Sequence, residues 1–200
     1  MGILLHNILA VLPQERESSH AAGQFSNEKN TVKETDIYIE GSRIAAIGHK
    51  PDNFSADKII DGKDKLAIPG LINCHTHSYM SFMRNVADDL SFMDWLFGRI
   101  DPIEQKMTDE DTYWGACLAI VEMMKSGTTC FNDMQMNIHQ TTRAVKESGM
   151  RAVICRGLVG NGNDEGGQER LRQAYEERDA AKDCDRLTFM LGPHAPYTCD

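Results

Sequence analysis

Two rhythms of apolar and polar residues follow one another along the chain, and the change falls near residue 70. In the first part, short apolar runs are separated by turn residues such as Gly41 and Gly62, a pattern that predicts β-strands. The predicted strands cover residues 3–12, 36–40, 43–47 and 58–61. We interpret residues 1–67 as a meander of small strands that forms a layer of a composite β-sandwich domain, with the polar residues 13–34 as a long exposed hairpin loop.

From residue 68 onward, strand patterns alternate with helix patterns. Strands are predicted at 71–77, 128–133, 150–156 and 187–192, and helices at 108–126, 137–148 and 167–182. The first helix begins with Thr108 as its N-cap and Asp111 three residues later, which is the arrangement of a capping box. The strands are apolar throughout rather than alternating, as is typical of parallel strands covered on both faces. These units predict an α/β fold, most economically a TIM-like (β/α)8 barrel.

The number of strands bears on the extent of this barrel. Eight strands and typically about 250 residues make a complete barrel, whereas residues 68–200 carry four predicted strands. Half a barrel leaves two long parallel edges unpaired, which soluble proteins avoid. We therefore expect these residues to be the N-terminal part of a barrel that belongs to a longer protein.

Composition and charge narrow the class of protein. The formal net charge is −9 and the basic residues are scattered rather than striped, which argues against nucleic acid as a partner. The apolar residues 3–12 are too few to span a bilayer, and no basic residue precedes them. The six cysteines form no CxxC pair, so we expect free thiols and a cytoplasmic protein.

The strongest candidate for chemistry is the pair His75 and His77 at the end of the predicted strand 71–77. Residues two apart on a strand point to the same face, so both imidazoles can bind one metal ion. The carboxyl ends of barrel strands are where such folds carry their active sites. The alternative is two polar residues at a strand end. Asp133 ends the next strand and should face the same mouth, where it could orient metal ligands or cap the backbone.

The segment Pro69-Gly70-Leu71-Ile72-Asn73-Cys74-His75-Thr76-His77 resembles the signature of the amidohydrolase superfamily of metal-dependent barrels. Three further segments are similar to the branch that contains 5-methylthioadenosine/S-adenosylhomocysteine deaminases and triazine hydrolases. They are residues 80–90, residues 95–96 together with 102–104, and residues 192–197. The resemblance covers essentially the whole chain.

The resemblance implies that His75 and His77 are two ligands of a divalent metal, with Zn²⁺ expected first and Fe²⁺ or Mn²⁺ as alternatives. In the family, a further His and an Asp complete the metal site, and a Glu and another His serve the substrate. All four should lie beyond Asp200, so no catalytic acid or base is expected within this chain. A metal of this kind lowers the pKa of its bound water toward about 7.

The resemblance also points to two substrate contacts, and the strand ends point to two more. Glu104 matches the position that holds ribose hydroxyls in nucleoside deaminases, although an acid near a helix start can also serve the helix dipole. Trp95 matches a residue that walls the substrate pocket, and a core Trp is the alternative. Arg156 and His194 end the third and fourth strands, so both should point into the barrel mouth. An acidic neighbour is the other way to satisfy a buried Arg.

These features predict a hydrolytic deaminase of an adenosine-type or related heteroaromatic amine. The expected partner is this small-molecule substrate, and assembly into a homo-oligomer is compatible with the sequence. The branch often carries a second Arg after its paired glycines, where this chain has Gln168, and whether Arg170 substitutes is open. Triazine dechlorination and guanine or cytosine deamination are the alternatives within the superfamily. A non-catalytic metal or interaction module is the alternative from another class.

Overall fold

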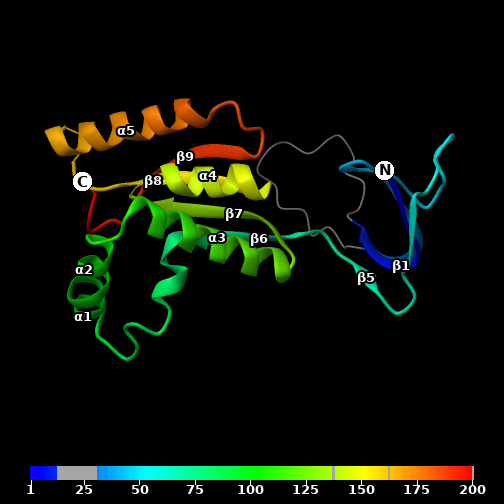
Figure 1. Cartoon of the computed structure of the whole chain (residues 1–200), viewed down its shortest axis with the longest axis horizontal. Coiled ribbons are helices and arrows are strands. Elements are labelled where there is room, and N and C mark those ends of the chain that lie inside the picture. The colour runs from blue at the N-terminus through cyan, green and yellow to red at the C-terminus, as the bar shows by residue number, and fades with distance from the viewer. Residues whose placement is uncertain (13–30, 137, 162, 200) are drawn as a thin grey trace. The chain divides into compact units, whose positions relative to one another are not determined.

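The computed structural model describes residues 1–12, 31–136, 138–161 and 163–199, and the chain divides into two compact units, Met1–Pro69 and Gly70–Asp200. Most of the expected hairpin loop, residues 13–30, lies outside the described residues. Figure 1 shows the elements of each unit along the chain.

The first unit is a sheet with the strand order β3-β2-β1-β4, and β5 pairs with β1 beyond β4. Its strands are β1 (Gly2–Leu12), β2 (Thr31–Glu40), β3 (Arg43–Ile47), β4 (Lys58–Asp61) and β5 (Leu66–Ala67). The expected meander is correct for the antiparallel β1, β2 and β3. It is wrong for β4, which pairs with β1 in parallel, as does β5. The long strand β1 pairs with β2 along one edge, and β4 and then β5 pair with successive parts of its other edge.

Strand β2 begins five residues before the predicted start because β1 supplies partners along its whole length, down to the pair Leu12 and Thr31. Of the five added residues, 31–34 are exposed, so their largely polar character gives no strand pattern. Gly62 is required between β4 and β5, because a Cβ atom there would lie 2.4 Å from the Cβ of Ile8. The small core of this unit contains Ile8, Ala10 and Ile37.

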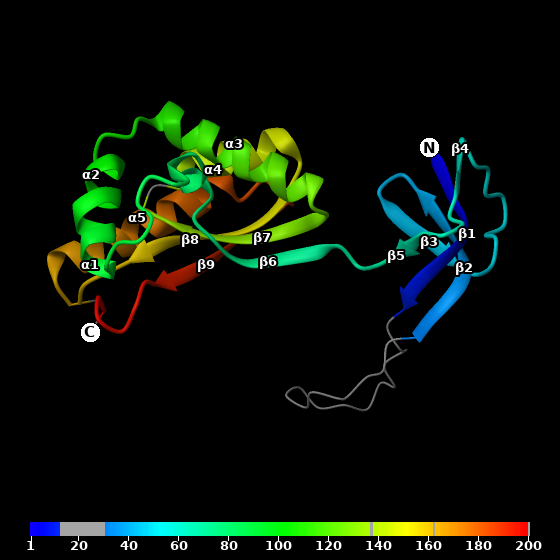
Figure 2. The ribbon, with the colours of Figure 1, turned by 90° about the horizontal axis from the view of Figure 1, so that it is seen from below.

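The second unit is a parallel sheet with the order β6-β7-β8-β9. Its strands are β6 (Leu71–Thr76), β7 (Thr128–Gln135), β8 (Arg151–Leu158) and β9 (Leu187–Pro193), connected in turn through α3 (Asp109–Lys125), α4 (His139–Ser148) and α5 (Glu165–Ala181). Figure 2 shows α3 and α4 on one side of this sheet. The alternation of strand and helix predicted from the sequence is therefore confirmed.

Local signals fixed several of these helix ends. The capping box of α3 is present, with the hydroxyl of Thr108 accepting from the backbone of Asp111 and the carboxylate of Asp111 accepting in return. Helix α4 ends at Gly149, which adopts the left-handed conformation with φ +73°. Helix α5 begins earlier than predicted because the carboxylate of Asp164 accepts from the backbone N–H of Gly167.

The segment between β6 and α3 holds helical turns that the sequence pattern did not predict. They are a 3-10 helix, η1 (Ser78–Met83), then α1 (Phe92–Trp95), the π-helix η2 (Leu96–Ile100) and α2 (Asp101–Glu104). The last three follow one another without a break, so Phe92 to Glu104 forms one helical run. Each piece is too short to show a helical repeat of apolar residues.

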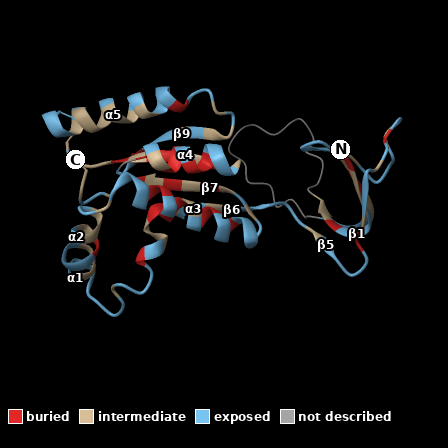
Figure 3. Cartoon of the chain, in the orientation of Figure 1, coloured by how far each residue is buried: buried red, intermediate tan, exposed pale blue. Residues whose placement is uncertain are grey.

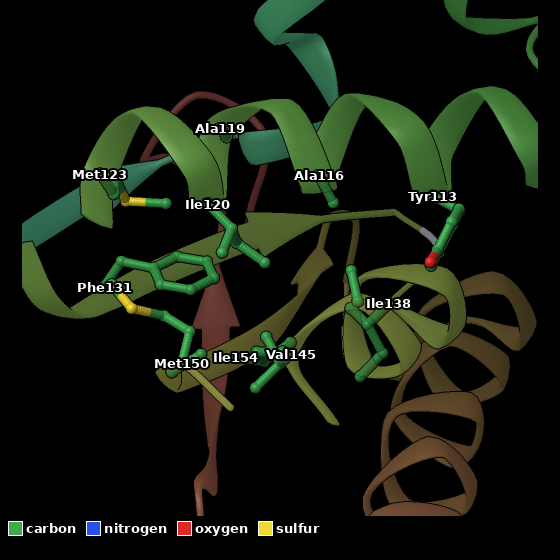
Figure 4. Packing of buried hydrophobic residues seen from close by; sticks show 12 residues of the cluster. Tyr113, Ala116, Ala119, Ile120, Met123, Phe131, Ile138, Val145, Met150 and Ile154 are labelled. Atoms are coloured by element: carbon green, nitrogen blue, oxygen red, sulfur yellow. The ribbon is translucent and has the colours of Figure 1, made fainter. Parts of the chain in front are cut away.

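The core of the second unit lies between the sheet and helices α3 and α4, where Phe131 and Ile154 from the strands meet Ile120 and Val145 from the helices. Figure 4 shows these side chains directed toward one another, and Figure 3 shows the buried residues concentrated there. Phe131, Ile154 and Val145 have no exposed surface. This packing holds β7 and β8 at the centre of the sheet.

The two edge strands are less covered than the sequence suggested. Leu71 and Ile72 on β6 are 49% and 67% exposed, and Met190 and Leu191 on β9 are 60% and 55% exposed. The expectation of strands covered on both faces is therefore wrong for β6 and β9 in the described part of the chain. All six cysteines are free thiols, as predicted. None of the helices in the described ranges has the length and apolar character needed to cross a membrane, and the cytoplasmic location stays a prediction.

Candidate active site

The carboxyl end of β6 carries the two predicted metal ligands. The pairing with β7 is irregular here, with one extra residue in β6 between Asn73 and Thr76. A bulge of this kind redirects side chains at the end of a strand. The rings of His75 and His77 lie 5.1 Å apart between centroids, with their planes at 85°. The two imidazoles therefore gather on the same side, as the spacing predicted.

Hydrogen bonding selects the form of His77. Its Nδ1 atom lies 2.7 Å from the carbonyl oxygen of Met134 on β7. Because a carbonyl oxygen only accepts, Nδ1 carries the proton and donates. The lone pair is then on Nε2, which is the arrangement of a neutral histidine that binds a metal while its other nitrogen is held by a backbone carbonyl.

The distance between the rings fits a shared metal. Two imidazoles that bind one zinc ion at about 2.0–2.1 Å and at a tetrahedral angle have ring centres about 5 Å apart. The observed separation of 5.1 Å between His75 and His77 matches this value. Across the described ranges, no group of three or more His, Cys, Asp and Glu side chains is arranged to hold a metal ion. The pair therefore offers two candidate ligands.

Asp133 lies beside this pair but does not face the mouth, in contrast to the expectation. Its side chain is 0% exposed and lies on the same face of β7 as Phe131, which packs under the helices. Its Oδ1 accepts from the hydroxyl of Thr76 at 2.7 Å and from the backbone N–H of Ser78 at 2.8 Å. Burial raises the pKa of Asp133, and the hydrogen bonds from Thr76 and Ser78 oppose that rise. These bonds tie Asp133 to the backbone at the start of η1 and to both residues that flank His77.

Glu104 lies in a pocket of about 320 Å³ with Tyr79, Thr112 and Gln135 among its lining residues. The hydroxyl of Tyr79 donates to Oε1 of Glu104. Burial and the nearby Glu104 carboxylate raise the pKa of Tyr79, so this hydroxyl stays protonated and available as a donor. Glu104 ends the helical run, which removes the helix-dipole explanation for its charge.

Gln135 adds a second polar group to this pocket. It is 3% exposed, and its Nε2 donates to Asp133 and to Thr141. Its Oε1 is buried and has no hydrogen-bond partner among the described residues. A buried oxygen without a donor is costly, so this side chain is a polar group of the pocket lining whose hydrogen bonding is incomplete. Neither Gln135 nor Tyr79 could be singled out from the sequence, because both look like ordinary strand and loop residues.

Trp95 and His194 are joined by a row of aromatic rings. Trp95 lies 6.0 Å from Phe92, Phe92 lies 6.3 Å from Tyr197, and Tyr197 lies 6.2 Å from His194, all between ring centroids. The row links the helical run at residues 92–104 with the segment that follows β9. Trp95 is half-buried, whereas His194 is exposed and its Nδ1 lies 3.0 Å from the hydroxyl of Thr198. The structure thus brings two of the predicted substrate contacts into one aromatic wall.

Arg156 differs from the expectation that it points into the barrel mouth. Its guanidinium donates to Oε1 of Glu177 at 2.8 Å and to Oε1 of Gln173 at 2.5 Å, both on α5. The side chain is 15% exposed. Arg156 is therefore paired with an acidic neighbour, Glu177, which was the alternative to a contact with the substrate. Its apolar neighbours in β8 gave no alternation from which this direction could be predicted.

Two residues near the start of α5 complete the predicted set. Gln168 is exposed. Arg170 is half-buried, and its Nη1 donates to the carbonyl oxygen of Val159, just after the end of β8. Arg170 rather than Gln168 is therefore held against the carboxyl end of the sheet.

Residues 66–200 match the amidohydrolase family. This chain belongs to the amidohydrolase family. The matched residues include His75, near the end of β6, and His77, directly after it.

Curated relatives place the chain within this family. It is 44% identical over 205 residues to a 5-methylthioadenosine/S-adenosylhomocysteine deaminase of Syntrophomonas wolfei. This match covers 100% of the chain and 44% of the relative. It is 46% identical over 170 residues to a 5'-deoxyadenosine deaminase of Methanocaldococcus jannaschii, covering 84% of the chain and 40% of the relative. The chain thus spans less than half the length of these curated relatives.

Solved structures share the fold. An adenosine deaminase from Xanthomonas campestris with bound zinc matches with a TM-score of 0.80 and 28% identity, covering 99% of this chain and 44% of that one. An atrazine chlorohydrolase from Arthrobacter aurescens complexed with zinc matches with a TM-score of 0.76 and 20% identity, covering 99% of this chain and 48% of that one. The second likeness shows the fold alone.

Proposed function

We propose that this chain is part of a zinc-dependent amidohydrolase that removes the exocyclic amine of adenosine-type nucleosides by hydrolysis. The observation that carries the proposal is the pair of imidazoles, 5.1 Å apart, in which His77 presents Nε2 because its Nδ1 donates to a backbone carbonyl. Relatives named as deaminases of adenosine derivatives and a zinc-containing adenosine deaminase of similar fold support it.

The four parallel strands and the coverage of the relatives support a further part of the proposal. We infer that β6 to β9 are the first half of an eight-stranded barrel in a longer polypeptide, with the first unit as a layer of a β-sandwich domain. The exposed apolar side chains on the edge strands β6 and β9 favour further strands at both edges. The remaining metal ligands and the catalytic acid and base would then come from the second half.

A divalent cation held by His75 and His77 would supply an activated water at neutral pH. The residues of this chain would bind and orient the nucleoside. The aromatic row from Trp95 to Tyr197 offers flat apolar faces to a purine or its substituent. His194, at the end of the row, offers a ring nitrogen for a hydrogen bond to the base.

Glu104 is suited to the sugar. A carboxylate can accept from two vicinal hydroxyl groups at once, and Gln135 is among the polar residues that line the pocket around it. Tyr79 already donates to Glu104, so it holds the carboxylate in one orientation. A ribonucleoside would therefore bind with its hydroxyl groups as donors in this pocket.

The decisive experiment removes the metal from the full-length protein. We expect a chelator to abolish ammonia release from 5'-methylthioadenosine and from adenosine, and Zn²⁺ to restore it. His77→Ala should lower the zinc content, whereas His49→Ala, at an exposed histidine in the first unit, should leave it unchanged. Full activity in metal-free protein would overturn the proposal.

A second experiment tests the sugar contact. Glu104→Gln should raise KM for ribonucleosides and should change KM for 2'-deoxynucleosides much less, because the deoxy sugar has no vicinal diol in that position. Equal effects on both classes of nucleoside would refute this role of Glu104. A panel of guanine, cytosine and triazine substrates, read by ammonia release and by ultraviolet absorbance, separates adenosine deamination from the other reactions on this fold.

A further inference from the structure

The two histidines lie on a segment whose backbone ladder is interrupted. Strand β6 carries one residue more than β7 between Asn73 and Thr76, so the regular backbone bonds do not fix His75 in register. Hydrogen bonds from side chains of β7 hold this part of β6 instead. The amide of Asn132 donates to the carbonyl oxygen of Cys74 at 3.2 Å, before His75.

Asp133 makes the densest set of these bonds. Its Oδ1 accepts from the hydroxyl of Thr76 at 2.7 Å and from the backbone N–H of Ser78 at 2.8 Å. Its Oδ2 accepts from the hydroxyl of Ser78 and from the amide of Gln135, both at 2.7 Å. The residues that flank His77 on both sides are therefore bound to one carboxylate.

Burial makes this arrangement rigid. Asp133 is 0% exposed, Ser78 is 2% exposed and Gln135 is 3% exposed. Water cannot replace a bond that is lost inside such a cluster, so each donor is tied to the carboxylate. The neighbour of Asp133, Met134, supplies the carbonyl that holds Nδ1 of His77. The same short piece of β7 thus fixes the position of His77 and the choice of its protonated nitrogen.

We propose that Asp133 is a positioning residue, which holds Thr76 and Ser78 so that the His75 and His77 imidazoles keep the separation and orientation that one metal ion requires. The hydrogen bonds of Asp133 run to Thr76, Ser78 and Gln135. It acts through the backbone of β6 and the start of η1. The inference rests on the proposed function for the metal, but the alignment of His77 is independent of it.

The principal test compares Asp133→Ala with the wild type in the full-length protein. Loss of a partner that orients a ligand typically lowers metal affinity by about 10- to 100-fold, so we expect the zinc Kd, measured by competition with a chelator, to rise by that factor. The visible absorption bands of the Co²⁺-substituted protein should also change shape. Asp133→Asn keeps one acceptor oxygen for Thr76 and Ser78 and should recover part of the affinity.

A matched control separates positioning from general loss of stability. Val145→Ala alters a residue with no exposed surface in the core beneath α4, away from the histidine pair. It should lower the stability but leave the zinc Kd within about twofold, as expected for a distant, independent site. A similar rise in the zinc Kd for Val145→Ala and Asp133→Ala would overturn the proposal.

A measurement on the metal-free protein distinguishes this inference from the proposed function. The ¹⁵N shifts of His77 should report protonation at Nδ1 in the wild type and a mixture of tautomers in Asp133→Ala. If the wild type binds no zinc, the proposed function fails, and these shifts still decide the role of Asp133. If Asp133→Ala does not fold, Thr76→Val and Ser78→Ala remove the donors singly; wild-type zinc affinity and wild-type His77 shifts in both would overturn the proposal.

Discussion

Replacing Arg156 by Met should destabilise the protein through the carboxylate left behind on α5. Arg156 and Glu177 form an ion pair of 2.8 Å, and their side chains are 15% and 18% exposed. Burial raises the pKa of Glu177 more than the attraction of Arg156 lowers it. The carboxylate is thus only partly compensated while Arg156 is present, and it becomes an unpaired buried charge once Arg156 is gone.

The size of the effect follows from this burial. Removing one partner of a fully buried ion pair costs about 3–5 kcal/mol, and the remaining exposure lowers our expectation for Arg156→Met to about 2–3 kcal/mol near neutral pH. A carboxyl group whose pKa is raised on folding contributes stability at low pH that is lost as the pH rises through its folded pKa. Because the substitution raises the pKa of Glu177 further, the loss should be larger at about pH 7.5 than at about pH 5.

Urea unfolding at the two pH values measures this difference. Glu177→Gln should relieve the loss, so the double variant should be less destabilised than the sum of the single variants. Arg172→Met is the control, since its partners Glu169 and Glu176 are exposed, and it should change the stability little. If Arg156→Met keeps wild-type stability at both pH values while the full-length enzyme loses substrate affinity, Arg156 serves the substrate and our reasoning is wrong.

Three further predictions concern other parts of the chain. Thr108→Ala removes the hydroxyl that accepts at the start of α3 and should lower the free energy of unfolding by about 1 kcal/mol in urea titrations. Phe131→Ala removes a ring with no exposed surface and should cost about 3–5 kcal/mol by the same assay. The backbone N–H of Asn7 holds the pKa of Asp36 below its usual value of 3.8, so stability should fall as the pH drops below that value, and Asp36→Asn should flatten this dependence.

Each of these three predictions has its own control. Thr108→Ser keeps the hydroxyl and should behave as the wild type; a loss equal to that of Thr108→Ala would contradict the cap. Phe97 is 57% exposed, so Phe97→Ala should cost far less than Phe131→Ala, and equal costs would contradict the position of the core. An unchanged acid limb in Asp36→Asn would show that this carboxylate does not contribute to the pH dependence.

The sequence determined features that depend on near neighbours. The helix start at Thr108 and the stop at Gly149 are made by residues within four positions of one another, so they could be predicted from the sequence. The spacing of His75 and His77 also predicted that their rings lie close together, and the structure brings them together at a bulge near the end of β6. The alternation of strand and helix fixed the fold class in the same way.

Tertiary structure decided what depends on distant partners. The parallel pairing of β4 and β5 with β1 joins residues about 50 or more positions apart, and no local pattern encodes it. Arg156 turns toward α5 because Glu177 lies there, in a strand whose apolar neighbours do not distinguish its two faces. The burial of Asp133 also exists only once β6 lies beside β7. The sequence alone thus pointed to His75 and His77 as candidate metal ligands, and packing between β6 and β7 determined which bonds hold His77 and its neighbours in place.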